Sequence, residues 1–283
     1  MPCATPSSGR CSTAAKPGAT PAARGEALCR ASGAAMVRRA ALQHPLPRQT
    51  VPESAMNILK TLWKATDIFL AMSGLRLDAG RFLMAWIPLL GACVCLIYQA
   101  ERHGCLVEFA IASWVFYYVG ISLILGTRIK RVMLEKLGEN NATKLYDMIC
   151  GLMFFNIGSG MGAAALHAMG TIDLPPAQQW GLFWLLTVVG LGVKFWATWI
   201  VGVNTYYFRD LFLEKSHGEF TARGPYKWLA NPMYGVGNLH SYCPALLTGS
   251  LFGLWFALGC HLSIYAFYFF VERPFIRRTY QHA

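Results

Sequence analysis

Four long apolar runs, separated by short polar segments, dominate the pattern of the chain. They span residues 82–98, 106–125, 148–169 and 181–203. Each run is ~17 to 25 residues long with at most one formal charge, which is the length that an α-helix needs to cross a hydrocarbon core of ~30 Å. The pattern therefore predicts four transmembrane helices.

A fifth apolar stretch, residues 239–271, has the wrong length for a single helix. Its 33 residues would form a helix of about 50 Å, too long for one crossing and too short for two complete ones. Gly249 and Ser250 interrupt the stretch midway. We therefore expect two short or tilted legs that break between Thr248 and Gly253. The expected fold is an all-α polytopic membrane protein with four transmembrane helices plus a C-terminal helical hairpin.

Lysine and arginine residues are concentrated in alternate polar segments. Residues 51–81, 126–147, 204–238 and 272–283 contain four, five, four and three of them, whereas residues 99–105 and 170–180 contain one and none. Cytoplasmic segments of membrane proteins carry the excess of Lys and Arg. This bias predicts that both termini are cytosolic, and that the polar segment 223–242 faces the C-terminal tail on the same side.

The composition agrees with a membrane protein, since 55% of the residues are hydrophobic, only 14% are charged, and the mean hydropathy is +0.37. No strand and helix patterns alternate, which excludes a soluble Rossmann fold. The first fifty residues differ, because Ala, Pro, Ser and Gly dominate them, with seven basic residues and one acid, Glu26. Such a segment cannot build a core. We expect residues 1–55 to be a disordered or targeting-like extension.

The strong basicity does not indicate nucleic-acid binding. The first fifty residues contribute +6 of the formal net charge of +11, and the remaining +5 suits loops beside anionic lipid head groups. The expected partner is therefore the lipid bilayer and no nucleic acid. The nine cysteines form no C-x-x-C pair and no Cys/His cluster at ligand spacing, so we expect no metal site.

The segment RGPYKWLANPMYGVGNLHSY, residues 223–242, is polar, rich in aromatic residues and punctuated by Gly and Pro. Two closely spaced X-Pro pairs, at Pro225 and Pro232, disfavour a helix. The segment is therefore predicted to be a shaped turn at the bilayer surface. Gly235 and Gly237 would let backbone N–H groups approach a carboxylate or a phosphate.

A second polar motif, VERPFIRRTY at residues 271–280, follows the last apolar stretch. It places Glu272 at the expected C-terminus of a helix, where the helix dipole disfavours a carboxylate. Either Glu272 pairs with the arginines at positions 273, 277 and 278, or it has a binding function.

The two motifs together resemble the C-terminal half of the phospholipid methyltransferases, which include the integral-membrane phosphatidylethanolamine N-methyltransferases. The resemblance rests on GPY at 224–226, NPMY at 231–234 with glycines after it, Tyr242, the hairpin, and ERPF at 272–275 with Tyr280. A wider superfamily includes isoprenylcysteine carboxyl methyltransferase. The resemblance is specific over residues 220–281, looser from residue 82, and absent before residue 56. It implies an S-adenosyl-L-methionine site formed by Gly235, Gly237, Asn238 and Glu272.

Two departures from the family pattern are informative. Asn231-Pro232 stands where many relatives have His-Pro, which resembles the lipid enzymes more than the isoprenylcysteine enzymes. Glu272-Arg273 stands where many relatives have Glu-Glu, so one carboxylate remains of the expected two. The glycine spacing after Tyr234 is also one residue longer than in some relatives.

The residue types suit methyl transfer from a sulfonium to an amine, which requires alignment of donor and acceptor and removal of a proton. His240 is the candidate general base, or else a structural hydrogen-bonding residue. The rings of Tyr234, Tyr242 and Trp228 could face the sulfonium and the methylated ammonium. We expect Tyr234 and His240 to be catalytic, and Tyr242 and Trp228 to bind substrate.

Three basic residues have two interpretations each. Arg223 and Lys227 could bind the lipid phosphate, or serve only as positive flanks that set topology. Lys194 lies inside the run 181–203, where an ammonium group costs ~3 kcal/mol or more without water or a partner. It could meet a lipid phosphate or a cofactor carboxylate in a cavity, or it could snorkel toward the cytosol.

The expected function is S-adenosylmethionine-dependent N-methylation of the ethanolamine headgroup of phosphatidylethanolamine or its mono- and dimethylated forms, toward phosphatidylcholine. Residues 56–203 would supply membrane helices and amphipathic segments, and residues 204–283 the catalytic loop, hairpin and tail. The expected location is the endoplasmic reticulum membrane, or an organelle envelope if residues 1–50 are a transit peptide. The alternatives are a protein-S-isoprenylcysteine O-methyltransferase, and a transporter or non-catalytic membrane protein, which would spread polar groups over several spans.

Overall fold

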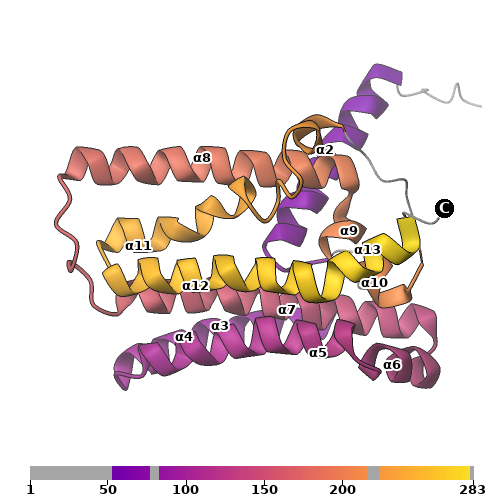
Figure 1. Ribbon diagram of the computed structural model, residues 1–283, viewed down its shortest axis with the longest axis horizontal. Helices are drawn as coiled ribbons and strands as arrows, with labels where there is room; N and C mark the ends of the chain where they lie inside the picture. The colour runs from indigo at the N-terminus through magenta and orange to yellow at the C-terminus, as the bar shows by residue number, and fades with distance from the viewer. Residues whose placement is uncertain (1–52, 77–82, 216–222, 281–283) are drawn as a thin grey trace, which may run out of the picture. The chain divides into compact units, whose positions relative to one another are not determined.

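The computed structural model describes residues 53–76, 83–215 and 223–280 (Figure 1). Two compact units divide the chain, residues 1–53 and 54–283, and the following description concerns the second. Every regular element among the described residues is a helix, and none is a strand. The expected all-α membrane fold is confirmed. The extension expected at residues 1–55 lies almost wholly outside the described residues.

Among the described residues, five helices are long and apolar enough to cross a membrane. Three of them are the single helices α3 (Leu83–Arg102), α7 (Glu139–Leu166) and α8 (Pro176–Val201). Another is a continuous helix made of α4 (Leu106–Trp114), the π-helical turn η2 (Val115–Val119) and α5 (Gly120–Gly126), and it lies between α3 and α7 in the chain. The last is made of α12 (Leu251–Phe267), the π-helical turn η5 (Tyr268–Glu272) and α13 (Arg273–Tyr280). The first four correspond to the four apolar runs of the sequence. Other helices lie before and between them: α2 (Glu53–Met72), α6 (Ile129–Leu137), α9 (Val203–Tyr206), α10 (Arg209–Leu213) and the 3₁₀ turn η3 (Gly224–Lys227).

The C-terminal stretch forms a hairpin with unequal legs, which corrects the expected count of four full spans. The first leg is short and consists of the 3₁₀ helix η4 (Val236–Tyr242) followed by α11 (Cys243–Thr248). The second leg is a full-length helix, because helical structure continues beyond Val271 through Glu272 as far as Tyr280. The apolar pattern ends at Val271, but the arginine-rich α13 extends the helix.

The break between the legs lies where the sequence predicts it. Gly249 adopts φ +63°, a left-handed conformation that favours glycine. Ser250 caps α12, since its hydroxyl oxygen accepts a hydrogen bond from the Gly253 N–H at 3.0 Å. The connection between α7 and α8 holds this tip through two backbone hydrogen bonds, from Gly170 N to Thr248 O and from Ile172 N to Gly249 O.

The first leg runs antiparallel to α8 (Figure 1). Two side-chain contacts join this leg to α8. The Cys243 thiol lies 3.2 Å from the Thr187 hydroxyl, and the Gln179 side-chain amide donates a hydrogen bond to Leu246 O at 2.6 Å. Near His240 the two backbones approach closely at Gly190, where a Cβ would lie 2.6 Å from the His240 nitrogen. Small residues permit such close helix packing in membranes.

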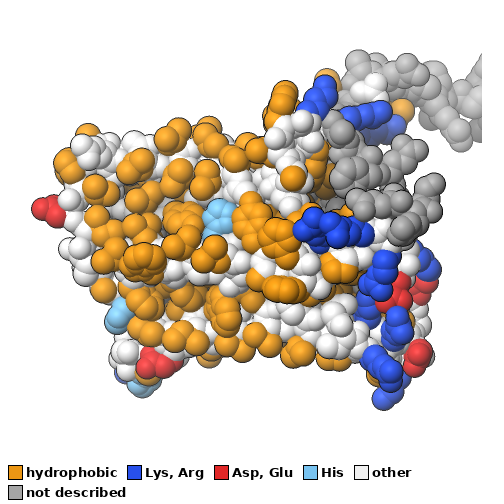
Figure 2. Space-filling view, in the orientation of Figure 1, with side chains coloured by type: hydrophobic (Ala, Val, Ile, Leu, Met, Phe, Trp, Pro, Cys, Tyr) orange, Lys and Arg blue, Asp and Glu red, His pale blue; other side chains and the backbone are white. Residues whose placement is uncertain are grey.

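Basic side chains gather at one end of the described molecule (Figure 2), the end that carries α6, α10 and α13 in Figure 1, and hydrophobic side chains cover the middle. The polar segment after residue 223 begins near this end, as does the C-terminal helix α13. The charge distribution therefore agrees with the expectation that these two segments share one side of the membrane.

Ion pairs at this end hold the segment that follows α8 against α6 and α7. Lys130 donates to the backbone oxygen of Leu211 at 3.1 Å and pairs with Glu214 at 3.0 Å. The buried carboxylate of Asp147 pairs with Arg209. These contacts position α9, α10 and the residues between them, among which Tyr206 and Phe208 are aromatic residues of the candidate site.

Candidate active site

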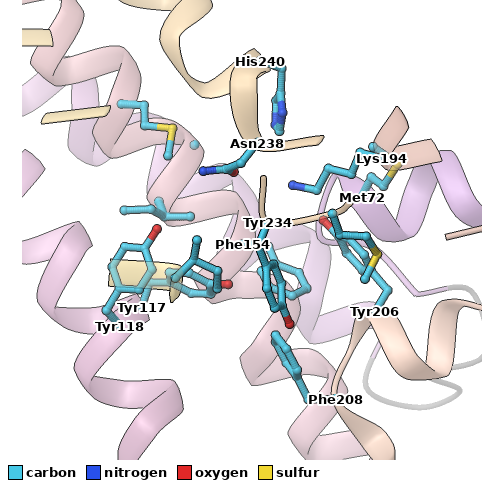
Figure 3. A pocket seen from close by; sticks show the side chains of 15 residues that line it. Met72, Tyr117, Tyr118, Phe154, Lys194, Tyr206, Phe208, Tyr234, Asn238 and His240 are labelled. Carbon is cyan, nitrogen blue, oxygen red and sulfur yellow. The ribbon is translucent and has the colours of Figure 1, made fainter. Parts of the chain in front are cut away.

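A cavity of about 170 Å³ lies between α2, η2, α7, α8, the segment after α8, and the loop that leads into η4 (Figure 3). Six of its fifteen lining residues are Tyr or Phe: Tyr117, Tyr118, Phe154, Tyr206, Phe208 and Tyr234. Its polar lining consists of Lys194, Asn238 and His240. Since pockets that enclose a drug-sized ligand measure ~300–1,000 Å³, this cavity would hold one part of a larger molecule.

A π-helical turn supplies two of the aromatic residues. Tyr117 and Tyr118 are consecutive in η2, both are buried, and their rings meet edge to face at 4.6 Å. The second π-helical turn, η5, ends at Glu272. Single π-helical turns inside α-helices are frequent at functional sites, and here both adjoin the same region.

Lys194 directs its ammonium group toward the cavity from α8 (Figure 3). Its Nζ lies 5.7 Å from the centre of the Tyr206 ring, a cation–π contact. Among the described residues, no carboxylate pairs with it. Of the two interpretations left open by the sequence, the structure favours the cavity over snorkelling.

Asn238 lines the cavity with a side-chain amide that lacks a partner. Its Nδ2 is buried and makes no hydrogen bond to any described residue. Its backbone N–H donates to Gly235 O at 3.0 Å, which fixes the residue in the turn. Buried polar groups are nearly always hydrogen-bonded, so this amide is a candidate ligand-binding group.

Tyr234 connects the cavity to Glu272, because its ring lines the cavity and its hydroxyl donates to Glu272 Oε2 at 2.7 Å. Burial, and then the Glu272 carboxylate, raise the pKa of Tyr234. Glu272 itself is not among the lining residues, and its helix continues past it, so it does not lie at a helix C-terminus as expected. Within the described residues it forms no ion pair with the neighbouring arginines.

His240 lies on the cavity wall with one ring nitrogen already engaged. Its Nδ1 is 2.7 Å from Gly237 O. In the neutral imidazole this carbonyl can only accept, so Nδ1 carries the proton and Nε2 keeps its lone pair. A general base needs such a lone pair.

The two glycines of the turn have a packing role in this structure. The N–H of Gly235 donates to Asn231 O at 2.9 Å and that of Gly237 to Pro232 O at 2.7 Å, so the turn itself engages both groups. A Cβ on Gly237 would lie 2.8 Å from Pro232 O and 3.2 Å from the Cβ of Lys194. The glycine thus lets η4 approach α8 beside Lys194.

The remaining expected site residues lie away from the cavity lining. Arg223, Lys227 and Trp228 are exposed, and the Trp228 ring packs against Trp196 at 6.3 Å. The hydroxyl of Tyr242 lies 3.2 Å from Nδ1 of His261 on α12. The structure therefore brings together Tyr234, Asn238 and His240 of the expected set, and adds Glu272 through Tyr234.

Most of the aromatic residues that line the cavity could not be recognised as site residues from the sequence. Tyr117, Tyr118 and Phe154 lie within apolar runs, where aromatic residues are ordinary core residues. Tyr206 and Phe208 follow α8 without a motif. Lys194 did carry a signal, since it is a charge inside a predicted span.

Sequence comparisons match the part of the chain that contains the polar lining residues Lys194, Asn238 and His240. Residues 180–283 match the phospholipid methyltransferase family. The resemblance carried by the sequence motifs is thus confirmed over this segment. It contains Lys194, Tyr234, Asn238, His240 and Glu272.

Three curated relatives of the chain are described as phosphatidylethanolamine N-methyltransferase. The protein of Schizosaccharomyces japonicus is 35% identical over 100 residues, which cover 35% of this chain and 11% of the relative. That of Aspergillus niger is 30% identical over 118 residues, 42% of this chain and 11% of the relative. That of Schizosaccharomyces pombe is 34% identical over 95 residues, 34% of this chain and 10% of the relative. The chain thus spans about a tenth of the length of these relatives, and no solved structure matches it.

Proposed function

We propose that the protein transfers methyl groups from S-adenosylmethionine to the ethanolamine headgroup of phospholipids. The substrates would be phosphatidylethanolamine and its mono- and dimethylated forms, and the final product phosphatidylcholine. The observation that carries the proposal is the family match over residues 180–283. The same segment contributes the three polar side chains of the cavity and the linked pair of Tyr234 and Glu272.

The residues present suit the methyl donor. S-adenosylmethionine supplies an electrophilic methyl group on a positively charged sulfur, and aromatic faces attract such a cation. The cavity offers the faces of Tyr234, Tyr206 and Phe154. One carboxylate oxygen of Glu272 accepts a hydrogen bond from the Tyr234 hydroxyl, and the other can accept a hydrogen bond from a ribose hydroxyl. We propose Glu272 for cofactor binding on these grounds.

The chain's own residues would orient the amine and receive its proton. In the transfer, a bond forms between the amine nitrogen and the methyl carbon, the bond between that carbon and sulfur breaks, and its electron pair stays on sulfur. The attacking amine must be neutral, so a proton has to leave the ammonium headgroup. Nε2 of His240 is the acceptor that the cavity provides. The aromatic wall would then stabilise the more highly methylated, cationic products.

A lipid acceptor is favoured over a prenylated cysteine. The family match is to phospholipid methyltransferases, the relatives described above are phosphatidylethanolamine N-methyltransferases, and the chain has Asn231-Pro232 in its turn. The gathering of Lys194, Asn238 and His240 around one cavity also differs from the dispersed polar groups expected of a transporter. We further propose an endoplasmic reticulum location with the basic end in the cytosol.

Labelled methyl transfer tests the proposal. The full chain in lipid nanodiscs would receive methyl-labelled S-adenosylmethionine and, separately, phosphatidylethanolamine, its monomethyl and dimethyl forms, or a prenylated cysteine. We expect label in the lipid fraction and little in prenylcysteine. Label in prenylcysteine alone would favour the alternative enzyme, and no label in any acceptor would contradict both.

A further inference from the structure

Lys194 and Asn238 are two cavity-lining groups whose polar ends are not satisfied by the described residues. The Lys194 ammonium makes a cation–π contact with the Tyr206 ring, which attracts a cation without neutralising it. The Asn238 Nδ2 is buried without a hydrogen-bond acceptor. Both groups are donors, and both line the same cavity.

Backbone packing brings the backbone before Asn238 close to Lys194. Gly237 precedes Asn238, and a Cβ on Gly237 would lie 3.2 Å from the Cβ of Lys194. The turn bond from Gly237 N to Pro232 O and the bond from Asn238 N to Gly235 O hold this backbone in place. In Figure 3 the Lys194 and Asn238 side chains extend toward the middle of the cavity from different elements.

The rest of the lining supplies no negative charge to match the ammonium. The remaining residues are aromatic, aliphatic or thioether side chains, together with Gly158 and His240. The acidic residues that form ion pairs at the basic end, such as Asp147 and Glu214, are engaged by Arg209 and Lys130. An ammonium group in a membrane protein interior is retained at a cost in stability and marks a functional site by default.

We propose that Lys194 and Asn238 form a subsite for an anionic oxygen group, a carboxylate or a phosphate. The ammonium provides the charge and the amide N–H provides a directed hydrogen bond. Under the proposed function two ligands carry such a group, namely the carboxylate of the methyl donor and the phosphate of the lipid. The identity of the ligand rests on the proposed function, whereas the subsite rests on the two unsatisfied donors.

Binding measurements on the full chain in nanodiscs separate the two sources. Lys194→Met keeps the length of the side chain and removes its charge. If the subsite holds the carboxylate, this variant binds S-adenosylmethionine about 10- to 100-fold more weakly, and its affinity for the decarboxylated donor equals that of the wild type. If the subsite holds the phosphate, the variant binds phosphatidylethanolamine more weakly by a similar factor, and its affinity for dioleoylglycerol, which lacks a phosphate, is unchanged.

Variants of Asn238 test the geometry independently. Asn238→Leu removes the amide donor, and Asn238→Asp replaces it with a carboxylate that would neutralise Lys194 and repel an anion. We expect Asn238→Asp to weaken binding of the anionic ligand more than Asn238→Leu. Lys194→Arg, which keeps the charge, should retain affinity within about threefold. Lys136→Met, at an exposed lysine of α6, is the matched control and should leave all affinities unchanged.

Thermal melting distinguishes a binding role from a structural one. A lysine that serves the fold through the Tyr206 ring would give Lys194→Met a lower melting temperature, whereas an uncompensated ammonium gives it an equal or higher one. Affinities within twofold of the wild type for both ligands would overturn the proposal, whatever the melting temperature. If wild-type protein transfers no methyl group but Lys194→Met still weakens anion binding, the proposed function fails and the subsite stands.

Discussion

At the scale of single residues, the hydroxyl of Tyr234 decides how Glu272 can act. It donates to Oε2 of Glu272, and because burial and this carboxylate raise the pKa of Tyr234, the hydroxyl keeps its proton and remains a donor. None of the described residues donates a hydrogen bond to Oε1. One carboxylate oxygen is therefore held for orientation and the other is left for a ligand.

Glu272→Gln should weaken S-adenosylmethionine binding by about 10- to 100-fold. The amide oxygen of Gln can still accept the bond from Tyr234, but a charge-assisted hydrogen bond to the ligand, worth ~1.5 to 3 kcal/mol, is lost. Isothermal titration of the purified variant would measure the change. Arg273→Ala is the control and should have a much smaller effect, since the Arg273 guanidinium packs 5.6 Å from the centre of the Phe269 ring, whereas Glu272 is the residue that Tyr234 links to the cavity. Unchanged affinity in folded Glu272→Gln would remove Glu272 from the cofactor site.

At the scale of elements, close backbone packing between α8 and η4 fixes the positions of the polar lining residues Lys194, Asn238 and His240. Two glycines of α8 provide a matched test of this contact. A Cβ on Gly190 would lie 2.6 Å from the backbone nitrogen of His240, whereas a Cβ on Gly192 would have no atom within 4 Å. An alanine at position 190 would therefore clash with the backbone of His240, whereas an alanine at position 192 would clash with nothing.

Gly190→Ala should destabilise the protein by ~1–3 kcal/mol, the usual cost of overpacking, and should reduce methyl transfer because His240 must move. Gly192→Ala should be neutral or stabilising by up to ~1 kcal/mol, since Ala favours a helix over Gly. Melting curves and methyl-transfer rates of the pair would be compared. Equal behaviour of the two variants would show that α8 and η4 do not pack as described.

The ion pair between Lys130 and Glu214 should make the fold sensitive to acid. The hydrogen bond from Lys130, with a smaller contribution from Arg131, lowers the pKa of Glu214. A carboxyl group whose pKa is lowered by folding stabilises the fold above its ordinary pKa, and this stabilisation is lost as the pH falls through the lowered value. Glu214→Gln should therefore lower the melting temperature at pH 7 and abolish this part of the acid dependence.

The expected loss is modest, about 1 kcal/mol, because the Glu214 side chain is 42% exposed and solvent screens the pair. The matched control is Glu135→Gln on α6, where the carboxylate is exposed and forms no ion pair with any described residue. Melting temperatures of both variants between pH 3 and pH 7 provide the measurement. A Glu214→Gln curve parallel to that of the wild type would contradict the role of the pair.

Elements were easier to predict from the sequence than the site. Apolar length identifies the spans, and Gly249 identifies the hairpin tip, because both signals are local. α7 begins at Glu139, nine residues before the predicted run, since its first turns are polar and Asp147 is buried against Arg209, a partner 62 residues away. The cavity also depends on contacts between residues far apart in the sequence. Tyr117, Phe154 and Tyr206 come together only through the packing of different helices, which no local sequence pattern encodes.

At the scale of the whole molecule, the basic end predicts orientation. A tag after residue 283 should be accessible to protease from the cytosolic side of sealed vesicles, because this end carries the Lys and Arg of α6 and α13. A tag inserted after Asp173, in the connection between α7 and α8, is the control and should be cut only when the membrane is opened. The reverse pattern would place the cavity's basic end in the lumen and contradict a cytosolic site.

The short first leg of the hairpin also constrains how the chain enters the bilayer. Residues 236–248 form 13 residues of mixed 3₁₀ and α-helix, fewer than the ~20 apolar residues that insert as an independent span. Exposed irregular backbone is not tolerated in lipid, so η4 needs α8 beside it. During synthesis α7 and α8 emerge before η4, and α12 emerges after it. The order of the chain therefore delivers α8, which supports η4, before η4 itself, and α12, which packs over η4, last.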